Sequence, residues 1–436
     1  MRKSPVSVGI IGFGTVGTGV VKILLKKRKE LERKLGFPLV IRKIADIDIK
    51  RKRAIALPEN IFVTDGSGVI DDPSIDIVVE LIGGIHPAKE YILKAIKKGK
   101  HVITANKALL ASEGFDIFEA AQKNNVELGF EAAVAGGIPI IKIIREALIG
   151  NKIQAIYGII NGTSNYILTQ MTEEGVDFST AIKEAQALGY AEADPTLDVE
   201  GIDAAHKLAL LASLSFGTLF SLKEIYTEGI TKITPLDISF ASEFGYKIKL
   251  LAIAKQINNN IELRVHPTML PKEYLISSVN GVFNAVYVEG DAIGSALYYG
   301  KGAGEMPTGS AVVSDIVDIA RNIKTGAVNR IKGIEIQGKS GLRIKRMEDV
   351  QGCYYFRFSV LDKPGVLSKI SGILGGHNIS IKSVIQKERK KERAVPLVMM
   401  THRAKEKDVI YAIKEINKLS VVSGKPLYIR VEGGEE

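Results

Sequence analysis

The sequence predicts an α/β protein in three parts: a parallel sheet covered by helices, an α+β region, and a small βαββαβ unit at the C-terminal end. Its 436 residues correspond to two to four domains at roughly 100–200 residues each. Strands alternate with helices over residues 1–136, longer helices dominate the middle of the chain, and a second alternation occupies residues 351–436. These three patterns define the predicted parts.

The first part, residues 1–136, is predicted to consist of successive strand–helix units. The predicted strands are residues 6–11, 39–45, 75–82, 100–104 and 126–131, and the predicted helices are 15–34, 86–98 and 117–123. The strand at 75–82 is almost wholly apolar, which is typical of a parallel strand covered on both faces. Alternation at this spacing predicts βαβ units.

The middle part, residues 137–309, is predicted to be an α+β domain. Its predicted helices are 138–148, 166–174, 178–188 and 201–216, and its predicted strands are 154–160, 261–267 and 284–288. A strongly apolar helix at 310–322 is expected to return to the first part. Residues 323–350 are polar and contain several glycines, so they are expected to form a linker.

The last part, residues 351–436, is predicted to be ferredoxin-like. Its expected elements are a strand at 354–360, a helix at 365–374, strands at 379–385 and 395–401, a helix at 405–418 and a strand at 425–431. This βαββαβ order is the ferredoxin-like arrangement.

A glycine-rich turn follows the first strand and opens the first helix. It contains Gly12, Phe13, Gly14, Thr15, Val16 and Gly17. The first glycine would make the tight turn, the second would let a pyrophosphate approach the backbone, and the third would allow close helix–strand packing. The helix N-terminus would supply free N–H groups to the phosphates. The motif predicts a Rossmann-like dinucleotide-binding domain, with a purely structural turn as the alternative.

The choice between NAD and NADP rests on the end of the second strand. Asp46 lies where a carboxylate would bind the ribose 2′-OH of NAD. Lys50 and Arg51 open a basic run that could hold the 2′-phosphate of NADP, or could simply be solvated. We expect NADP slightly more than NAD and allow use of both.

Charged residues are unusually dense between Gly189 and Leu208. Glu192, Asp194 and Asp198 lie on a predicted loop, whereas Asp203 and Lys207 are four residues apart on a predicted helix face. Lys207 precedes an apolar run. A lysine beside an apolar pocket can deliver a proton, and nearby carboxylates would hold a substrate ammonium group.

Several motifs together resemble homoserine dehydrogenase over essentially the whole chain. They begin at Thr104 (Thr-Ala-Asn-Lys-Ala), Glu131 (Glu-Ala-Ala-Val-Ala-Gly-Gly-Ile-Pro), Asn161 (Asn-Gly-Thr-Ser-Asn-Tyr), Gly189 and Gly302 (Gly-Ala-Gly-Glu-Met-Pro-Thr-Gly). The resemblance implies reversible NAD(P)-dependent conversion of L-homoserine to L-aspartate 4-semialdehyde in threonine, methionine and isoleucine biosynthesis. It also implies a homodimer or homotetramer, with residues 137–309 as the substrate and dimerisation domain.

The resemblance assigns roles to particular residues. Lys207 matches the proton donor to the aldehyde oxygen, Glu192 matches a ligand of the amino-acid end of the substrate, and Asp198 and Asp203 match acids that position substrate and lysine. Lys107 matches a lysine near the nicotinamide and the substrate, where it would polarise the reacting oxygen or share the proton transfer. One or two lysines at that oxygen would stabilise its developing negative charge.

Further matches concern a cation and the cofactor. Glu131, Val134, Gly136 and Ile138 match a monovalent-cation loop, usually for sodium; the alternative is a tight turn with a water in place of the ion. Gly304 matches a glycine that closes over the cofactor, and Gly189 matches one beside cofactor and substrate, although both could serve only turn geometry.

The C-terminal part resembles an ACT domain on three stretches: Val360-Leu-Asp-Lys-Pro-Gly-Val-Leu, Gly376-His-Asn-Ile-Ser-Ile and Val384-Ile-Gln. By resemblance, Asp362, Gly365 and Asn378 would contact an amino-acid effector, with threonine as the expected one. Dimerisation without an effector is the alternative.

The composition and the apolar runs of the sequence exclude several classes of protein. The single cysteine, Cys353, excludes an internal disulfide framework and a multi-cysteine metal site. No apolar run reaches the roughly 18 residues of a spanning helix, and no signal peptide is recognisable. We therefore expect a cytoplasmic protein without a membrane partner.

The net charge of +10 lies in two blocks. Residues 22–53 carry 13 Lys/Arg and 4 Asp/Glu, residues 351–436 carry 16 and 9, and the stretch 54–350 is acidic. This distribution disfavours a nucleic-acid track. Two alternatives stay open: a ligand-sensing DNA binder, and another amino-acid or semialdehyde dehydrogenase with the same nucleotide-binding domain. No recognition helix supports the first, and no plausible catalytic cysteine supports an acylating aldehyde dehydrogenase.

Overall fold

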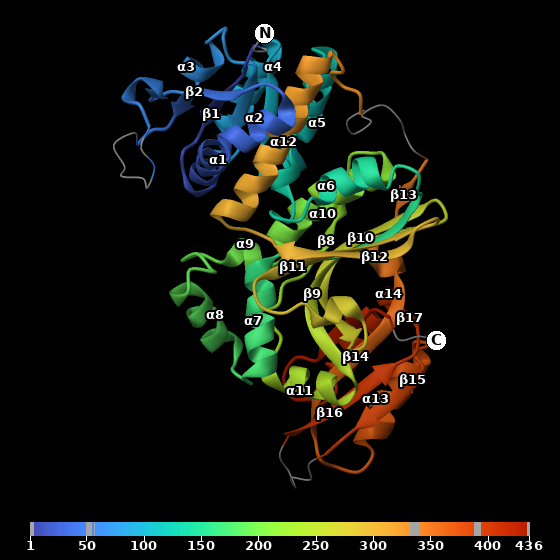
Figure 1. The fold of residues 1–436 in the computed structure, drawn as a ribbon. Helices are drawn as coiled ribbons and strands as arrows, with labels where there is room; N and C mark the ends of the chain where they lie inside the picture. The colour runs from blue at the N-terminus through green and yellow to red at the C-terminus, as the bar shows by residue number, and fades with distance from the viewer. Residues whose placement is uncertain (1–3, 49–54, 56, 332–340, 388–393, 434–436) are drawn as a thin grey trace. The chain divides into compact units, whose positions relative to one another are not determined.

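The computed structural model describes residues 4–48, 55, 57–331, 341–387 and 394–433 (Figure 1). The described residues form two compact units, each assembled from separate stretches of chain. Unit 1 lies within Met1–Gly162, Asp203–Ile225 and Phe283–Gly341, and unit 2 lies within Thr163–Ile202, Tyr226–Val282 and Leu342–Glu436. These two units do not coincide with the three domains predicted from the sequence. The domain boundaries at residues 136, 309 and 350 stay a prediction.

Unit 1 contains the predicted parallel sheet. Its strand order is β3-β2-β1-β4-β5-β6, and every neighbouring pair is parallel. The strands are β1 (Val6–Ile11), β2 (Leu39–Ala45), β3 (Phe62–Val63), β4 (Ile77–Glu80), β5 (His101–Thr104) and β6 (Leu128–Gly129). The order reverses direction at β1, and such a reversal places a crevice at the carboxyl ends of the central strands.

Helices in the nucleotide-binding part of unit 1 differ in detail from the predictions. The expected helix at 15–34 is divided at Lys27 into α1 (Thr15–Lys26) and α2 (Arg28–Leu35). The remaining helices are α3 (Ser67–Ile70), α4 (Ala88–Lys97) and α5 (Lys107–Lys123), and α5 begins ten residues before the expected start at 117.

Helix α12 (Glu305–Thr325) packs on α1 in unit 1. The two helices approach so closely that a Cβ added at Gly19 would lie 2.1 Å from the carbonyl oxygen of Glu305. Val312 and Ile316 enter the same buried cluster as Val20. A helix far along the chain therefore completes the core beneath the glycine turn.

Unit 1 also holds α10 (Ile202–Phe216) and three antiparallel strands, β7 (Ile153–Ile159), β11 (Phe283–Gly290) and β12 (Gly294–Lys301). The expected helix at 138–148 is only a short α6 (Ile140–Lys142) followed by a π-helical turn at Ile143–Ala147.

Unit 2 is built on a long antiparallel pair, β9 (Tyr246–Ile257) and β10 (Asn260–Pro271). Its helices are α7 (Gly162–Glu173), α8 (Phe178–Ala187), α9 (Thr196–Val199) and α11 (Pro235–Glu243). Three short strands pair in parallel with successive parts of β10: β13 (Arg343–Ile344), β8 (Tyr226–Thr227) and β18 (Leu427–Val431).

The C-terminal module has the predicted βαββαβ order. Its strands are β14 (Gln351–Leu361), β15 (Ile381–Ile385), β16 (Ala394–Thr401) and β18, its helices are α13 (Val366–Gly376) and α14 (Glu406–Ile416), and the short β17 (Ala404–Lys405) pairs with the start of β14. The sheet order is β18-β14-β16-β15. Because β18 also pairs with β10, one sheet continues from β9 and β10 into this module.

A buried ion pair holds the module to helix α11. Asp237 is fully buried, and its carboxylate accepts hydrogen bonds from Arg357 Nε at 2.6 Å and from Tyr355 OH at 3.2 Å. Breaking a buried pair by removing one partner typically costs 3–5 kcal/mol. The module is therefore part of the body of unit 2.

Candidate active site

The carboxyl ends of the parallel strands carry most of the predicted cofactor residues. Gly12 follows β1, Asp46 follows β2, and Lys107 follows β5 at the start of α5. Since carboxyl ends of parallel strands meet at one edge of a sheet, these residues belong to the crevice where dinucleotides bind in such folds.

The glycine turn has the geometry that a dinucleotide requires. Gly12 has φ +101°, and a Cβ there would lie 2.7 Å from the backbone of Leu81. A Cβ at Gly17 would lie 2.2 Å from the carbonyl oxygen of Gly12, whereas a Cβ at Gly14 would meet open space. No side chain caps α1, whose first residues are Thr15 and Val16. The backbone at Gly14 and the start of α1 thus fit a pyrophosphate.

Asp46 is tied to this turn. Its Oδ2 accepts a hydrogen bond from the N–H of Phe13 at 2.7 Å, and its Oδ1 accepts one from the N–H of Asp48 at 2.8 Å. The carboxylate therefore lies beside the glycine turn, as a ribose-binding acid should. Lys50 and Arg51, the predicted ligands of a 2′-phosphate, lie outside the described residues.

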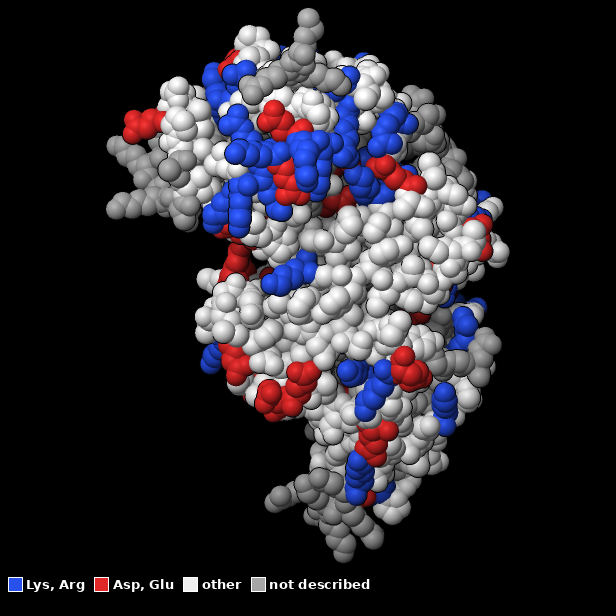
Figure 2. Space-filling model, in the orientation of Figure 1, with Lys and Arg blue, Asp and Glu red and all other residues white. Residues whose placement is uncertain are grey.

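Basic side chains gather near this part of unit 1. On the face in Figure 2, Lys and Arg concentrate over the region of α1 and α2, with Asp and Glu among them. Lys26, Lys27, Arg28 and Lys29 are exposed there. The positive block at 22–53 is thus at least partly a solvated helix surface.

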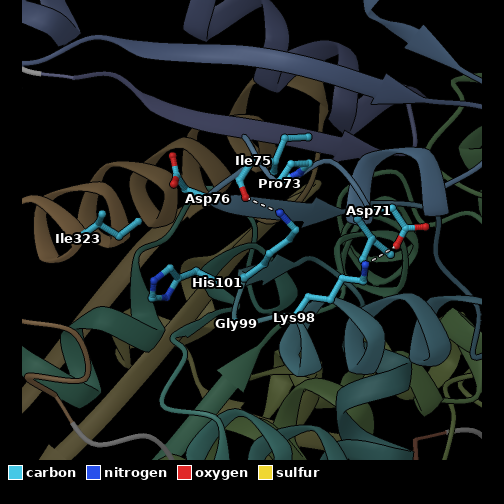
Figure 3. Close-up of a pocket in the computed structure, with 10 residues that line it drawn as sticks. Asp71, Pro73, Ile75, Asp76, Lys98, Gly99, His101 and Ile323 are labelled. Carbon is cyan, nitrogen blue, oxygen red and sulfur yellow. Dashed lines mark hydrogen bonds and ion pairs between the residues drawn. The ribbon is translucent and has the colours of Figure 1, made fainter.

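A cavity of about 450 Å³ lies at the opposite edge of the parallel sheet (Figure 3). Asp76 and His101 line it where β4 and β5 begin. Lys98 pairs with Asp71 at 2.9 Å, and Lys100 Nζ donates to the carbonyl oxygen of Ile75 at 2.6 Å. Since dinucleotides bind at the carboxyl ends of the strands, this cavity is not the cofactor site.

Two lysines share one carboxylate in unit 1. Lys207 Nζ lies 2.6 Å from Asp203 Oδ2, and Lys107 Nζ lies 3.0 Å from Asp203 Oδ1. Asn161 Nδ2 also donates to Asp203 Oδ2, at 2.9 Å, and Lys207 Nζ donates to the carbonyl oxygen of Ile160 at 2.8 Å. The expected contact between Asp203 and Lys207 is present, and Lys107, the first residue of α5, joins it.

The electrostatics favour a charged cluster. Burial alone would raise the pKa of Asp203, but the ammonium groups of Lys207 and Lys107 and the hydrogen bonds to its oxygens hold that pKa well below its ordinary value. Two positive charges then face one negative charge. The excess positive charge suits a site where oxygen becomes negative during reaction.

The segment Asn161–Asn165 supplies hydrogen bonds that sequence reasoning missed. Besides the bond from Asn161, Thr163 Oγ1 donates to the carbonyl oxygen of Tyr190 at 2.7 Å, and Ser164 Oγ donates to that of Asp198 at 2.7 Å. The signal was the run of polar residues directly after a strand, but nothing local indicates the distant partners.

The predicted substrate loop belongs to unit 2. Gly189 has φ +73° and lies two residues after α8. Glu192 is exposed on the following loop, and Asp198 is half-buried in α9. Ser164 fixes the backbone at Asp198, and Thr163 fixes it beside Gly189.

In the predicted cation loop, both carboxylate oxygens of Glu131 already accept hydrogen bonds from backbone N–H groups. Glu131 accepts the N–H groups of Ile141 and Lys142, both at 2.9 Å, and its own N–H donates to Asp315 Oδ2. Burial, with the nearby charge of Asp315, raises the pKa of Glu131 to about 7. Among the described residues, no group of three or more His, Cys, Asp or Glu side chains is placed to hold a metal.

The other cation-loop residues can offer backbone oxygens. Gly136 adopts φ +45°, and a Cβ there would lie 2.4 Å from the carbonyl oxygen of Gly302. The carbonyl of Ile138 accepts the N–H of Ile140 at 2.8 Å. Val134 is fully buried in the same turn. Gly304, with φ +125°, immediately precedes α12.

The predicted effector residues lie at the two ends of one helix. Gly365, with φ +84°, immediately precedes α13, shortly after Asp362, whereas Asn378 follows the end of the same helix. Eleven helical residues span about 16 Å at 1.5 Å per residue. One small effector cannot touch both ends of α13 within a single chain.

Comparisons with known proteins agree with this arrangement. A family model described as homoserine dehydrogenase matches residues 139–317, its NAD-binding domain matches residues 12–131, and an ACT domain model matches residues 354–421. The chain is 48% identical to a homoserine dehydrogenase of Pseudomonas aeruginosa over 434 residues, which is 98% of this chain and 99% of that relative.

Two solved structures are also similar. A homoserine dehydrogenase from Thiobacillus denitrificans has a TM-score of 0.93 and 47% identity, with 99% of each chain covered. A hyperthermophilic archaeal homoserine dehydrogenase in complex with NADPH has a TM-score of 0.62 and 27% identity, covering 72% of this chain and 97% of its own.

The fold class predicted from the sequence and the resemblance drawn from its motifs are both confirmed. In the described residues, no helix is long and apolar enough to cross a membrane. Since relatives nearly half identical match almost the full length, this protein belongs to the homoserine dehydrogenase family and combines its NAD-binding and catalytic domains with a C-terminal ACT domain.

Proposed function

We propose that the chain catalyses the reversible NAD(P)-dependent interconversion of L-homoserine and L-aspartate 4-semialdehyde. The observation that carries the assignment of the site is the contact of Lys107 and Lys207 with the two oxygens of one buried carboxylate, Asp203. Family membership supports the reaction, and this cluster supports the place where it occurs.

The nicotinamide cofactor would supply the hydride. Gly12, Phe13, Gly14, Thr15, Val16 and Gly17 would hold its phosphates, with Asp46 at the ribose and Gly189 and Gly304 near the reactive end. We propose NADP as the preferred cofactor, with Lys50 and Arg51 at the 2′-phosphate, and allow NAD as well.

In the direction of aldehyde reduction, Lys207 would donate a proton to the carbonyl oxygen as negative charge develops there. Lys107 would stabilise that oxygen electrostatically. Asp203 would hold both Nζ atoms in place, and its lowered pKa keeps it an acceptor across the physiological pH range. Glu192 and Asp198 would bind the substrate ammonium group.

A sodium ion would bind through backbone carbonyls of the loop that contains Val134, Gly136 and Ile138. Both oxygens of Glu131 already accept backbone N–H groups, so this residue would support the loop more than supply a free carboxylate. The ion would order the turn without taking part in proton transfer.

The biological setting completes the proposal. We place the enzyme in the cytoplasm, in threonine, methionine and isoleucine biosynthesis, as a homodimer or homotetramer. Threonine would act through Asp362, Gly365 and Asn378. The separation of these residues along α13 favours an effector site completed by a second subunit.

Steady-state kinetics with homoserine and each cofactor, with and without threonine, test the function. We expect homoserine-dependent reduction of NADP, slower reduction of NAD, and inhibition by threonine. Failure to oxidise homoserine with either cofactor would overturn the assignment, whereas activity without threonine inhibition would remove only the regulatory part.

A further inference from the structure

A second cavity, of about 330 Å³, lies in unit 2 where three distant segments meet. Glu200, directly after α9, forms one wall, residues 226–232 form another, and Tyr428 of strand β18 forms a third. The volume is within the range of small-molecule sites. Neither the Asp203 cluster nor the predicted effector residues line this cavity.

A buried ion-pair network lies behind Tyr226, Glu228 and Tyr428, three of the residues that line the cavity. The guanidinium of Arg430 lies between the rings of Tyr226 and Tyr428, 4.9 and 5.2 Å from their centroids. It forms ion pairs with Glu228 at 2.8 Å and with Glu406 at 2.5 Å, and its side chain is 5% exposed. Such a network fixes Tyr226, Glu228 and Tyr428 before any ligand arrives.

The charges around the cavity suit a ligand with both signs. Arg430 pairs with two carboxylates, Glu228 and Glu406, so one positive charge faces two negative charges, and Glu228 is the one of the two carboxylates that lines the cavity. Glu200 adds a second carboxylate, which accepts a hydrogen bond from Thr231 Oγ1 at 3.2 Å. Lys232 is exposed at the same cavity and makes no ion pair with another described residue.

We propose that this cavity binds a free L-α-amino acid, with its ammonium group between Glu200 and Glu228 and its carboxylate on Lys232. The two carboxylates disfavour a phosphate-bearing ligand, and the lysine disfavours a bare metal cation. Tyr226, Thr231 and Tyr428 offer hydroxyl groups and ring faces to the side chain of the ligand.

The cavity is connected to the proposed substrate loop. The N–H of Ile230 donates to the carbonyl oxygen of Val199 at 2.8 Å, and Glu200 is only two residues after Asp198. A ligand that holds Glu200 would therefore restrain α9. This consequence, a changed KM for homoserine, rests on the proposed function, whereas binding itself does not.

Calorimetry on the full-length protein tests binding directly. Each proteinogenic L-amino acid is titrated without cofactor or homoserine. We expect at least one to bind, with its Kd weakened at least tenfold by Lys232→Met and by Glu200→Gln. Asp362→Ala at the ACT turn and Glu192→Gln on the substrate loop are matched controls that should leave this Kd unchanged.

Because Lys232 is exposed, its replacement should leave the melting temperature near that of the wild type. Absence of binding by every amino acid would overturn the proposal. So would binding that survives Lys232→Met and Glu200→Gln but is lost in Asp362→Ala, since the ligand would then occupy the ACT turn. Binding with the expected variant pattern in a protein that does not oxidise homoserine would uphold the cavity and refute the proposed function.

Discussion

Two lysines, one in each unit, show how neighbouring groups determine the electrostatic environment of a buried ammonium group. Lys207 in unit 1 has a side chain 11% exposed and contacts the carboxylate of Asp203. Lys249 in unit 2 is 2% exposed and donates hydrogen bonds to neutral oxygens: the carbonyl of Val279 at 2.6 Å and the amide oxygens of Asn165 and Asn280, both at 3.1 Å.

The two environments have opposite electrostatic consequences. At Lys249, burial, together with the nearby charge of Lys247, lowers the pKa to about 7, and the weaker opposing effect of Glu173 does not offset this. At Lys207, the contact with a carboxylate compensates the charge, and the cluster keeps Asp203 ionised. The proposed proton donor is thus held by an acid, whereas Lys249 donates hydrogen bonds inside a core.

The largest expected effect comes from removing the proposed proton donor. Lys207→Ala should lower kcat about 10³-fold, because general-acid catalysis typically contributes 10²–10⁴-fold. Binding of NADPH, followed by fluorescence titration, should be unchanged. Lys249→Met is the matched control for loss of a buried ammonium group. A comparable loss of kcat in a folded Lys249→Met protein would break the distinction between the two lysines.

Asp203→Asn tests whether the negative charge of Asp203 is needed for the proposed role of Lys207 and Lys107. The change leaves an isosteric side chain but removes the charge that both lysines face, so kcat/KM for homoserine should fall about 100-fold. Asp194→Asn is a suitable control, because Asp194 is exposed and accepts hydrogen bonds from the backbone and hydroxyl groups of the nearby Thr196. Activity within threefold of the wild type in Asp203→Asn would contradict the role proposed for Asp203.

The pH dependence of stability tests the environment of Lys249. Between its folded pKa of about 7 and the ordinary 10.5, the unfolded chain binds the extra proton, so the wild type should become more stable as pH rises through this range. Relative to Lys249→Met, we expect a gain of about 1–2 kcal/mol between pH 7 and pH 9.

Denaturant unfolding of both proteins at several pH values measures this gain. Lys272→Met, at an exposed lysine that bonds to Ser242, controls for the loss of a positive charge. Parallel stability curves for the wild type and Lys249→Met would show that burial does not depress the pKa of Lys249.

The smallest expected effect concerns the positioning of the substrate loop. Ser164→Ala removes the hydrogen bond to the backbone of Asp198 and should raise KM for homoserine about three- to tenfold, the equivalent of roughly 1 kcal/mol, with kcat nearly unchanged. Ser179→Ala, at an exposed serine of α8, is the control. An unchanged KM in Ser164→Ala would remove the positioning role.

The Asp203–Lys207 contact could be predicted from the sequence, because four residues on a helix bring two side chains together whatever surrounds them. The glycine turn was likewise predictable from local order. The contact between Lys107 and Asp203 was not, because it depends on where α5 and α10 meet. Lys249 was missed for a similar reason: a lysine in the largely apolar strand β9 gives no sign of the carbonyl and amide oxygens that accept its hydrogen bonds.

The fold shows the same limit. The strand–helix order predicted both the parallel sheet and the ferredoxin-like module. Strands β9 and β12 were not predicted, and the pairing of β18 with β10 joins segments about 160 residues apart that no periodicity connects. The local sequence pattern predicts individual helices and strands, whereas pairing between distant segments determines which strands share a sheet.

That shared sheet has a practical meaning for anyone who shortens the gene. A protein that ends before β14 would lose the strand that pairs with β10 at Thr268 and Met269, and would leave bare backbone groups on a long strand. It would also remove Glu432, one of the ion-pair partners of the buried Arg264. Such a truncated enzyme is expected to aggregate. Low activity in it would therefore be explained by damage to the fold of unit 2 and would not measure the loss of feedback control.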